Sequence, residues 1–273
     1  MLSSLSSLLD SFRIPNRRRR GFNIFSRRCR RQTSSLRCQG IPGVSLQETL
    51  AHEPLEQRRL LAVDVSLAGS VLTVSFDDAS ADEVSVAITD SGYDSSGANI
   101  SSGNGTITQL IVQDSGTAQT SSFTLTEASQ NLTGGVSIAS EVDASAITSK
   151  VNTDGGAVAI NSSTLTLGAN VTSGGGSQTY DAAVVLASDV NLTTSTGVGG
   201  DLQVNFQGTV DSDDNATPRT LNVHSEAIYF DADVGSQSAL NDLVGYTVND
   251  SAERGQFYQS VHTTGNQTYQ AGT

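Results

Sequence analysis

The feature that most constrains this chain is a series of short runs in which apolar and polar residues alternate. Val63–Leu67 and Val71–Phe76 show the pattern clearly. Period-two alternation of this kind is typical of half-buried strands. Gly-, Ser-, Asn- and Asp-rich segments at 102–105, 154–156 and 174–176 separate the runs and favour turns. The pattern predicts an all-β body. Further runs are Val84–Ile88, Phe123–Leu125, Val136–Ile138, Val158–Ile160, Leu165–Leu167, Val190–Leu192, Leu202–Phe206 and Leu221–Val223.

Two features favour a β-solenoid over a β-sandwich. The inward positions of the runs are mostly Val, Leu, Ile and Ala, whereas a sandwich of this size normally buries more aromatic anchors. A phrase at Gly176–Ala182 also returns at Gly265–Ala271, with Gln178 and Gln267 lying 89 positions apart. That offset accommodates about four coils of roughly 22 residues. A chance return in so biased a composition is the alternative. The best short helical segment, Ala239–Leu243, predicts one turn at most.

The G-x-Q-T-Y-x-A phrase and the run Val184–Leu192 that follows it resemble the repeats of filamentous haemagglutinin-like bacterial adhesins. The resemblance covers about residues 164–273. It implies a right-handed parallel β-helix on a secreted surface protein. Parallel stacking would also let Asn and Thr at equivalent positions form ladders.

The charge of the chain inverts near residue 62. Residues 1–62 hold 12 basic and 4 acidic residues, net +8, and residues 63–273 hold 3 basic and 24 acidic residues, net −21. This asymmetry predicts a basic leader or export segment over 1–62, poorly ordered, joined to a β-solenoid-like repeat domain over 63–273. Because the second copy of the phrase is the last feature of the sequence, we expect a truncated domain or one from a longer family.

The stretch Leu55–Asp64 resembles the L-E-P-R-x-L-L motif of large bacterial surface proteins of planctomycete type, with Gln57 in place of the usual Pro. The resemblance implies export to the cell surface, with cleavage near or after Ala62. It implies a destination rather than an activity.

Three other interpretations of the leader stay open. An Arg- and Ser-rich segment with few acids is also typical of a mitochondrial transit peptide. Arg17–Arg20 and Arg27–Arg31 are clusters that contact phosphates in nucleic-acid-binding proteins, although the net −21 body would repel DNA. A basic tail without a role is the third. We expect no nucleic-acid partner, and no membrane span because the apolar stretches are far shorter than about 20 residues.

Disorder of most of the body is the alternative to a fold, because hydrophobicity is low and net charge high. The body nevertheless has one proline, Pro218, and many β-branched residues, which favours a folded chain. Both cysteines, Cys29 and Cys38, lie in the leader. The body therefore has no disulfide, no cysteine nucleophile and no thiolate metal site.

The body offers few groups for catalysis. Its histidines, His224 and His262, are expected to be surface residues, and Lys150, Arg219 and Arg254 are its only cations. A polysaccharide lyase needs a basic residue beside acids, and the chain also lacks Trp for stacking sugars. We therefore expect no enzyme activity and no cofactor.

The segment 211–215 has the Asp-x-Asp-x-Asn beginning of a calcium loop. Asp211, Asp213 and Asn215 are the candidate ligands. Ala216 stands where an EF-hand has Gly, and Asn222 where it has Glu, so the segment is not an EF-hand. Weak calcium binding is one interpretation, and carboxylates that only add solubility are the other.

These features together predict a non-catalytic secreted or cell-surface protein, adhesin-like or structural, located outside the cell. Its partner would be a surface receptor or a glycan of unknown identity. The alternatives are a polysaccharide-acting β-helix enzyme and a passive surface-layer protein. A groove with carboxylates beside Lys150, Arg219 or Arg254 would favour the enzyme.

Overall fold

The computed structural model describes residues 63–76, 81–97, 102–115, 120–194, 202–247, 255–257 and 260–271. The predictions made for the leader, 1–62, lie outside the described residues. None of the residues in these ranges is helical, and no helix there could cross a membrane. The described strands all belong to the unit Glu56–Thr273. The body is therefore all-β, as the alternation predicted.

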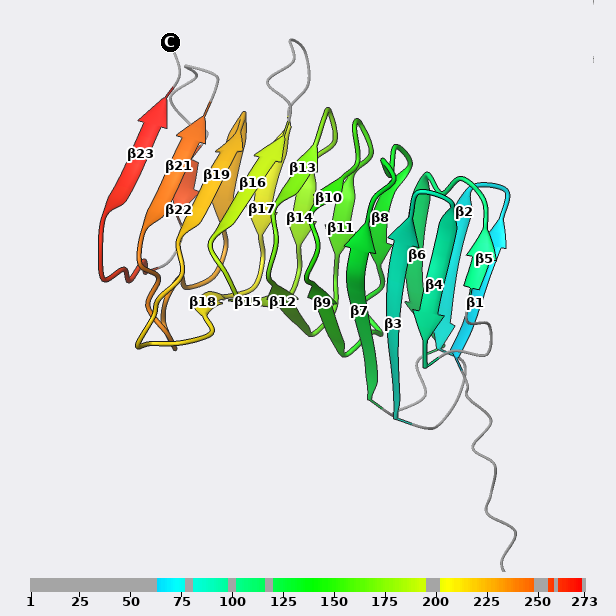
Figure 1. The fold of residues 1–273 in the computed structure, drawn as a ribbon. Helices are drawn as coiled ribbons and strands as arrows, with labels where there is room; N and C mark the ends of the chain where they lie inside the picture. The colour runs from blue at the N-terminus through cyan, green and yellow to red at the C-terminus, as the bar shows by residue number, and fades with distance from the viewer. Residues whose placement is uncertain are drawn as a thin grey trace, which may run out of the picture. The chain divides into compact units, whose positions relative to one another are not determined.

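The described strands form three sheets in which most neighbours run parallel (Figure 1). From β8 to β19 the chain enters the nine-, eight- and six-stranded sheets in strict rotation. In neighbour order, the nine-stranded sheet contains β1 (Val63–Ala68), β2 (Val71–Phe76), β6 (Gln109–Asp114), β8 (Gly135–Ile138), β11 (Val158–Ile160), β14 (Gln178–Tyr180), β17 (Gln203–Phe206), β20 (Ala227–Phe230) and β22 (Gly255–Phe257).

The other two sheets follow the same progression along the chain. The eight-stranded sheet contains, in neighbour order, β18 (Val210–Ser212), β15 (Ala183–Leu186), β12 (Thr164–Leu167), β9 (Ala144–Ile147), β7 (Ser121–Ala128), β3 (Asp82–Thr89), β4 (Gly92–Ser96) and β5 (Ser102–Asn104). The six-stranded sheet contains β10 (Val151–Asn152), β13 (Val171–Ser173), β16 (Val190–Thr194), β19 (Leu221–Ser225), β21 (Leu243–Thr247) and β23 (Gln267–Ala271).

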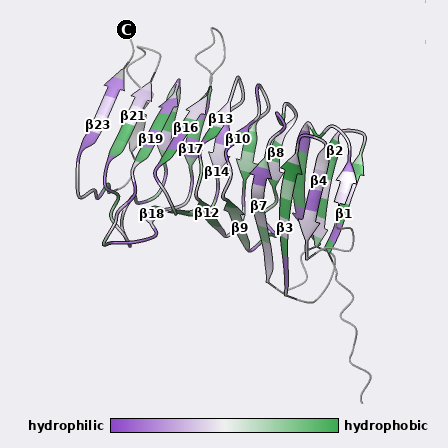
Figure 2. Ribbon diagram, in the orientation of Figure 1, coloured by the Kyte–Doolittle hydropathy of each residue, from purple (hydrophilic) through white to green (hydrophobic). Residues whose placement is uncertain are grey.

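The alternation of apolar and polar residues in the sequence corresponds to an alternation of buried and less buried residues along the strands. In β19, Leu221, Val223 and Ser225 are buried, and the two residues between them are less buried. Hydrophobic and hydrophilic positions accordingly alternate along the ribbons (Figure 2). All ten runs identified in the sequence coincide with strands. Each strand of this kind turns one apolar face inward and one polar face outward.

Parallel pairing in register builds continuous columns inside the body. In the nine-stranded sheet, Tyr180 pairs with Phe206 and Phe206 with Phe230, and all three are buried. Their rings stack at centroid distances of 5.1 and 4.9 Å. Earlier members of the same column are aliphatic: Val74, Val112, Ile138 and Ile160. Few inward aromatics were expected from the sequence, and three of the six buried aromatic side chains in the described body gather at one end of this column.

Antiparallel hairpins lie at the beginning of the described body. β1 pairs antiparallel with β2 at one end of the nine-stranded sheet. β3 pairs antiparallel with β4, and β4 with β5, at one end of the eight-stranded sheet. The segment 102–105, predicted as a turn, thus contributes strand β5 because Ser102–Asn104 completes this meander.

Two further expectations require correction. Ala239–Leu243 contains no helical turn: Leu240 forms a bridge with Thr263, and β21 begins at Leu243. The 89-residue return does not connect equivalent positions, because Gln178 begins β14 in the nine-stranded sheet and Gln267 begins β23 in the six-stranded sheet. Register partners are closer together in sequence: Val158 pairs with residues 22 and 20 positions away.

Candidate functional site

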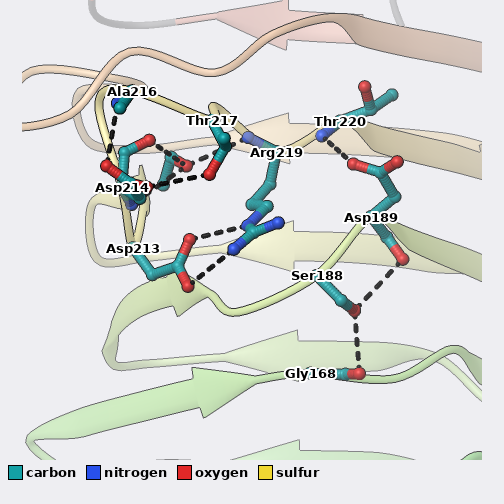
Figure 3. A network of polar contacts seen from close by, with 10 residues as sticks. Gly168, Ser188, Asp189, Asp213, Asp214, Ala216, Thr217, Arg219 and Thr220 are labelled. Atoms are coloured by element: carbon teal, nitrogen blue, oxygen red, sulfur yellow. Dashed lines mark hydrogen bonds and ion pairs between the residues drawn. The ribbon is translucent and has the colours of Figure 1, made fainter.

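The best-defined polar cluster of the described body is the loop that follows β18 (Figure 3). Arg219 binds Asp213 through both ends of the carboxylate, with Nε–Oδ1 at 2.7 Å and Nη2–Oδ2 at 3.1 Å. This fork-to-fork geometry is the strongest form of an arginine–carboxylate hydrogen bond. The hydrogen bond from Arg219 holds the pKa of Asp213 below its ordinary value, and the same contact raises the pKa of Arg219.

Asp214 organises the tip of the loop. Its Oδ1 accepts a hydrogen bond from the Ala216 amide at 2.8 Å, and its Oδ2 accepts one from the Thr217 hydroxyl at 2.8 Å. Aspartate side chains commonly accept from a backbone amide two residues on, and this contact defines a turn. The Ala216 amide is the main reason that the pKa of Asp214 is lowered.

The loop is tied to the neighbouring strands by Asp189 and Ser188. Asp189 Oδ1 accepts from the Thr220 amide at 2.8 Å, just before β19 begins. The Ser188 hydroxyl donates to the Gly168 carbonyl at 2.8 Å. Asp189 also lies close enough to contribute to the raised pKa of Arg219. Arg219 is therefore surrounded by three carboxylates, which is the kind of arrangement that the enzyme alternative requires.

The chemistry available to this cluster is nevertheless restricted. General acid–base catalysis works best when the pKa of the catalytic group lies near the working pH. Asp213 and Asp214 are held ionised, and Arg219 is held protonated. Each of these three side chains is engaged in the loop contacts described above. The arrangement fixes a loop, and none of the three is prepared for proton transfer.

The predicted calcium ligands lie near one another in sequence but have different roles. Asp211 is buried, and its Oδ1 accepts from the amides of Gln237 and Ser238 at 2.8 and 3.2 Å. Asp213 is paired with Arg219, and Asn215 is exposed at the loop tip. Across the residues that the structure describes, no three His, Cys, Asp or Glu side chains gather closely enough to hold a metal ion. Weak calcium binding stays a prediction.

The remaining candidate residues are scattered. Lys150 is exposed in a different part of the body, and Arg254 lies outside the described residues. His262 is exposed, as expected. His224 lies on the outer side of β19 but is only partly exposed, because its ring meets Tyr246 edge-on at 4.6 Å. The structure therefore places Arg219 beside the carboxylates of the loop, and neither His224 nor His262 lies in that cluster.

A ladder of asparagines runs along the outside of the six-stranded sheet. Asn191 Nδ2 donates to Asn170 Oδ1 at 3.3 Å, and Asn222 Nδ2 donates to Asn191 Oδ1 at 2.9 Å. The backbone amide of Asn191 also donates to Asn170 Oδ1 at 2.8 Å. Ladders of this kind were expected from parallel stacking, and their formation here is confirmed. The residues that form the ladder could not be predicted from the sequence, because their separations along the chain, 21 and 31 residues, are irregular.

The repeated phrase has a structural explanation that the sequence did not reveal. Gln178 is fully buried, and its Nε2 donates to Val171 O, Ser173 Oγ and Thr193 O at 3.3, 3.1 and 3.0 Å. Its Oε1 accepts from the Tyr180 hydroxyl at 2.9 Å, and burial raises the pKa of that hydroxyl. A buried amide needs this full set of partners.

Comparison of the chain with protein-family models, with curated proteins and with solved structures finds no match.

Proposed function

We propose that this chain is a non-catalytic secreted or cell-surface protein, adhesin-like or structural. In this proposal the three parallel sheets are the faces of a right-handed parallel β-helix that presents rigid surfaces to a receptor or glycan. The rotation of the chain through the sheets and the in-register columns support the β-helix. Repeat architectures commonly use such extended faces for binding.

The observation that carries the proposal is the asparagine ladder Asn170–Asn191–Asn222. Its amides are hydrogen-bonded to one another across neighbouring strands, so the outer face of the six-stranded sheet is held in a fixed arrangement. A preorganised polar face loses little conformational entropy when a ligand binds. The net −21 of residues 63–273 keeps such a surface soluble and disfavours anionic lipid and nucleic acid as partners.

A polysaccharide-acting enzyme is the second candidate, and one observation favours it. Arg219 lies beside Asp189, Asp213 and Asp214, which is the charge pattern that such a site would need. Two observations argue against an enzyme. The guanidinium of Arg219 is already occupied by its bidentate contact with Asp213, and the pKa of Arg219 is raised rather than lowered. A passive surface-layer protein is the third candidate.

A binding array tests the proposal. The full chain is applied to immobilised glycans and to bacterial and host cell surfaces, with calcium and with a chelator. We expect saturable binding to a subset of these surfaces that Asn191→Ala weakens and Asn104→Ala does not. Asn104 is exposed on β5 in the eight-stranded sheet and so provides a matched control away from the ladder. Binding to none of them would favour the passive surface-layer protein, and loss of binding in chelator would favour the calcium interpretation.

Export is proposed from the charge inversion and the Leu55–Asp64 motif. We expect the mature protein to be found at the cell surface with its N-terminus near Val63. Intact-mass measurement and N-terminal sequencing of protein released from the surface test this. A surface protein that begins at Met1 would refute removal of the leader, and import into isolated mitochondria would favour the transit peptide.

A further inference from the structure

The corner between β10 and β11 contains the only Asp–Gly sequence of the chain, Asp154–Gly155. Both residues are exposed, and a Cβ at Gly155 would have no atom within 4 Å. The Asp154 carboxylate lies beside the main chain of Gly174 on a neighbouring corner, since a Cβ at Gly174 would be 3.0 Å from Asp154 Oδ1. The described residues therefore leave the Asp–Gly bond open to water.

Hydrogen bonds fix the two ends of this corner but do not use its reactive groups. Gly156 N donates to Thr153 O at 3.1 Å, and the Thr153 hydroxyl donates to Gly156 O. Asp154 N donates to Asn152 Oδ1 at 3.2 Å. Within the part of the chain that the structure describes, neither the Gly155 amide nor the Asp154 carboxylate makes a hydrogen bond. The amide nitrogen and the carboxyl carbon beside it are thus both free to react.

The backbone at Asp154 is strained. Its φ is 40°, and no other non-glycine residue of the described ranges has a positive φ. A positive φ is unfavourable for an L-residue because Cβ comes too close to the following carbonyl oxygen, although Asp tolerates it better than most residues do. A main chain that runs through Cβ and Cγ instead leaves the α-carboxylate free to rotate, which relieves this contact. Rearrangement at this bond therefore removes strain.

The chain's only Asn–Gly sequence, Asn104–Gly105, lies in the opposite kind of environment. Gly105 N donates to Ser91 O at 2.9 Å, and Asn104 pairs with Gly92 in the ladder between β5 and β4. Attack by the Gly105 amide would require this hairpin to open first. In an unstructured peptide Asn–Gly is more reactive than Asp–Gly. The two sequences therefore separate the effect of the fold from the effect of local composition.

We propose that Asp154–Gly155 is a modification site at which the main chain rearranges without an enzyme. The Gly155 nitrogen attacks Cγ of the Asp154 carboxylic acid. An N–Cγ bond forms, the Cγ–OH bond breaks, and the hydroxyl leaves with the amide proton as water. The ring closure is intramolecular, and glycine presents no side chain that would hinder it.

Hydrolysis of the resulting succinimide completes the rearrangement. Water adds to the ring carbonyl that was the α-carbonyl of Asp154, and the bond from that carbon to the Gly155 nitrogen breaks. The product is isoaspartate, with a free α-carboxylate and a main chain that continues through Cγ. One water leaves and one returns, so the composition of the chain is unchanged. The inference concerns this corner alone and stands whether or not the proposed binding function holds.

Incubation of the full chain, folded in buffer and unfolded in urea, tests the proposal. Trypsin then releases the peptide 151–219, which follows Lys150 and ends at Arg219. Electron-transfer fragmentation of this peptide distinguishes isoaspartate from aspartate at position 154. We expect isoaspartate to form there in the folded chain within about threefold of its rate in urea, because no local opening is needed. Deamidation at Asn104 should be at least about tenfold slower in the folded chain than in urea.

Asp154→Glu keeps the charge and should abolish the product, because the longer side chain would have to close a less favourable six-membered ring. Asp181→Glu is the matched control and should leave conversion at 154 unchanged, since Asp181 is exposed at another corner of the same peptide. Far-ultraviolet circular dichroism verifies that each chain stays folded during the incubation. A folded chain without isoaspartate at 154 would overturn the proposal, whether or not the product forms in urea. Equal deamidation rates of Asn104 in the two states would also overturn it, because hydrogen bonding of the amide would then not control the reaction.

Discussion

Phe206 stacks on Tyr180 inside the body, with ring centroids 5.1 Å apart and planes inclined by 17°. The contact follows from the parallel register, which places the two residues side by side on β17 and β14. Phe230 continues the stack at 4.9 Å from Phe206. One in-register column thus joins three successive strands of the nine-stranded sheet through their aromatic rings.

We expect Phe206→Ala to lower the free energy of unfolding by about 3–5 kcal/mol, because it removes the middle ring of a buried stack and leaves a cavity. Thr179→Ala, on the outer side of β14, is the matched control and should change it by less than about 0.5 kcal/mol. Urea denaturation measures both. Equal effects of the two substitutions would contradict the assignment of inner and outer faces.

Gln178→Leu should destabilise the body by about 1–3 kcal/mol, because it leaves the buried Tyr180 hydroxyl without its acceptor. Adding Tyr180→Phe to Gln178→Leu removes the hydroxyl that has lost its acceptor. The double variant should therefore recover part of the lost free energy of unfolding. Gln267→Leu, in the exposed copy of the phrase, should cost less than Gln178→Leu. A double-mutant cycle of Gln178→Leu and Tyr180→Phe, measured by urea denaturation, gives the coupling between the two residues. Strict additivity of these two substitutions would argue against the hydrogen bond between them.

The fold class was predictable because alternation reports directly on which side chains are buried. All ten runs that alternate in the sequence are strands, and the turns at 154–156 and 174–176 are present. The strand Ser102–Asn104 was missed because its Ser, Gly and Asn residues favour turns, and its pairing with β4 overrides that local preference. Local patterns show where strands lie, and they do not show which strands pair.

The candidate site was less predictable. Sequence spacing selected Asp211, Asp213 and Asn215, whereas the loop is organised by Asp213, Asp214 and Arg219. Asp189, 31 residues before its partner Thr220, is brought to the loop only by the pairing of β16 with β19. A side chain from a neighbouring strand at an irregular sequence distance leaves no local signal.

Gly156→Ala should disrupt the corner before β11. A Cβ at Gly156 would lie 2.3 Å from Gly135 N and 2.6 Å from Gly135 Cα, backbone atoms that cannot move without separating the two strands. We expect a loss of about 1–3 kcal/mol, typical of an overpacked interior. Gly168→Ala is the control, because its nearest neighbour would be 3.6 Å away. Thermal denaturation compares them, and a Gly156→Ala variant as stable as Gly168→Ala would contradict the close approach.

The Asp213–Arg219 pair should give a small pH dependence in the acid range. Because the pKa of Asp213 is lowered below its ordinary value of 3.8 in the folded chain, the pair stabilises the fold above that value. The stabilisation is lost as the pH falls through the lowered pKa. The difference in melting temperature between the wild type and Asp213→Asn should therefore be present at neutral pH and disappear in strong acid. A difference that grows on acidification would contradict the sign.

The most direct test of the central claim, a rigid body that binds without catalysis, is product analysis after prolonged incubation of the full chain with a panel of polysaccharides. We predict saturable binding with no new reducing ends and no unsaturated products, and the same result for Arg219→Gln. Products that accumulate with time in the wild type and vanish in Arg219→Gln would contradict it and would assign catalysis to the cluster around Arg219.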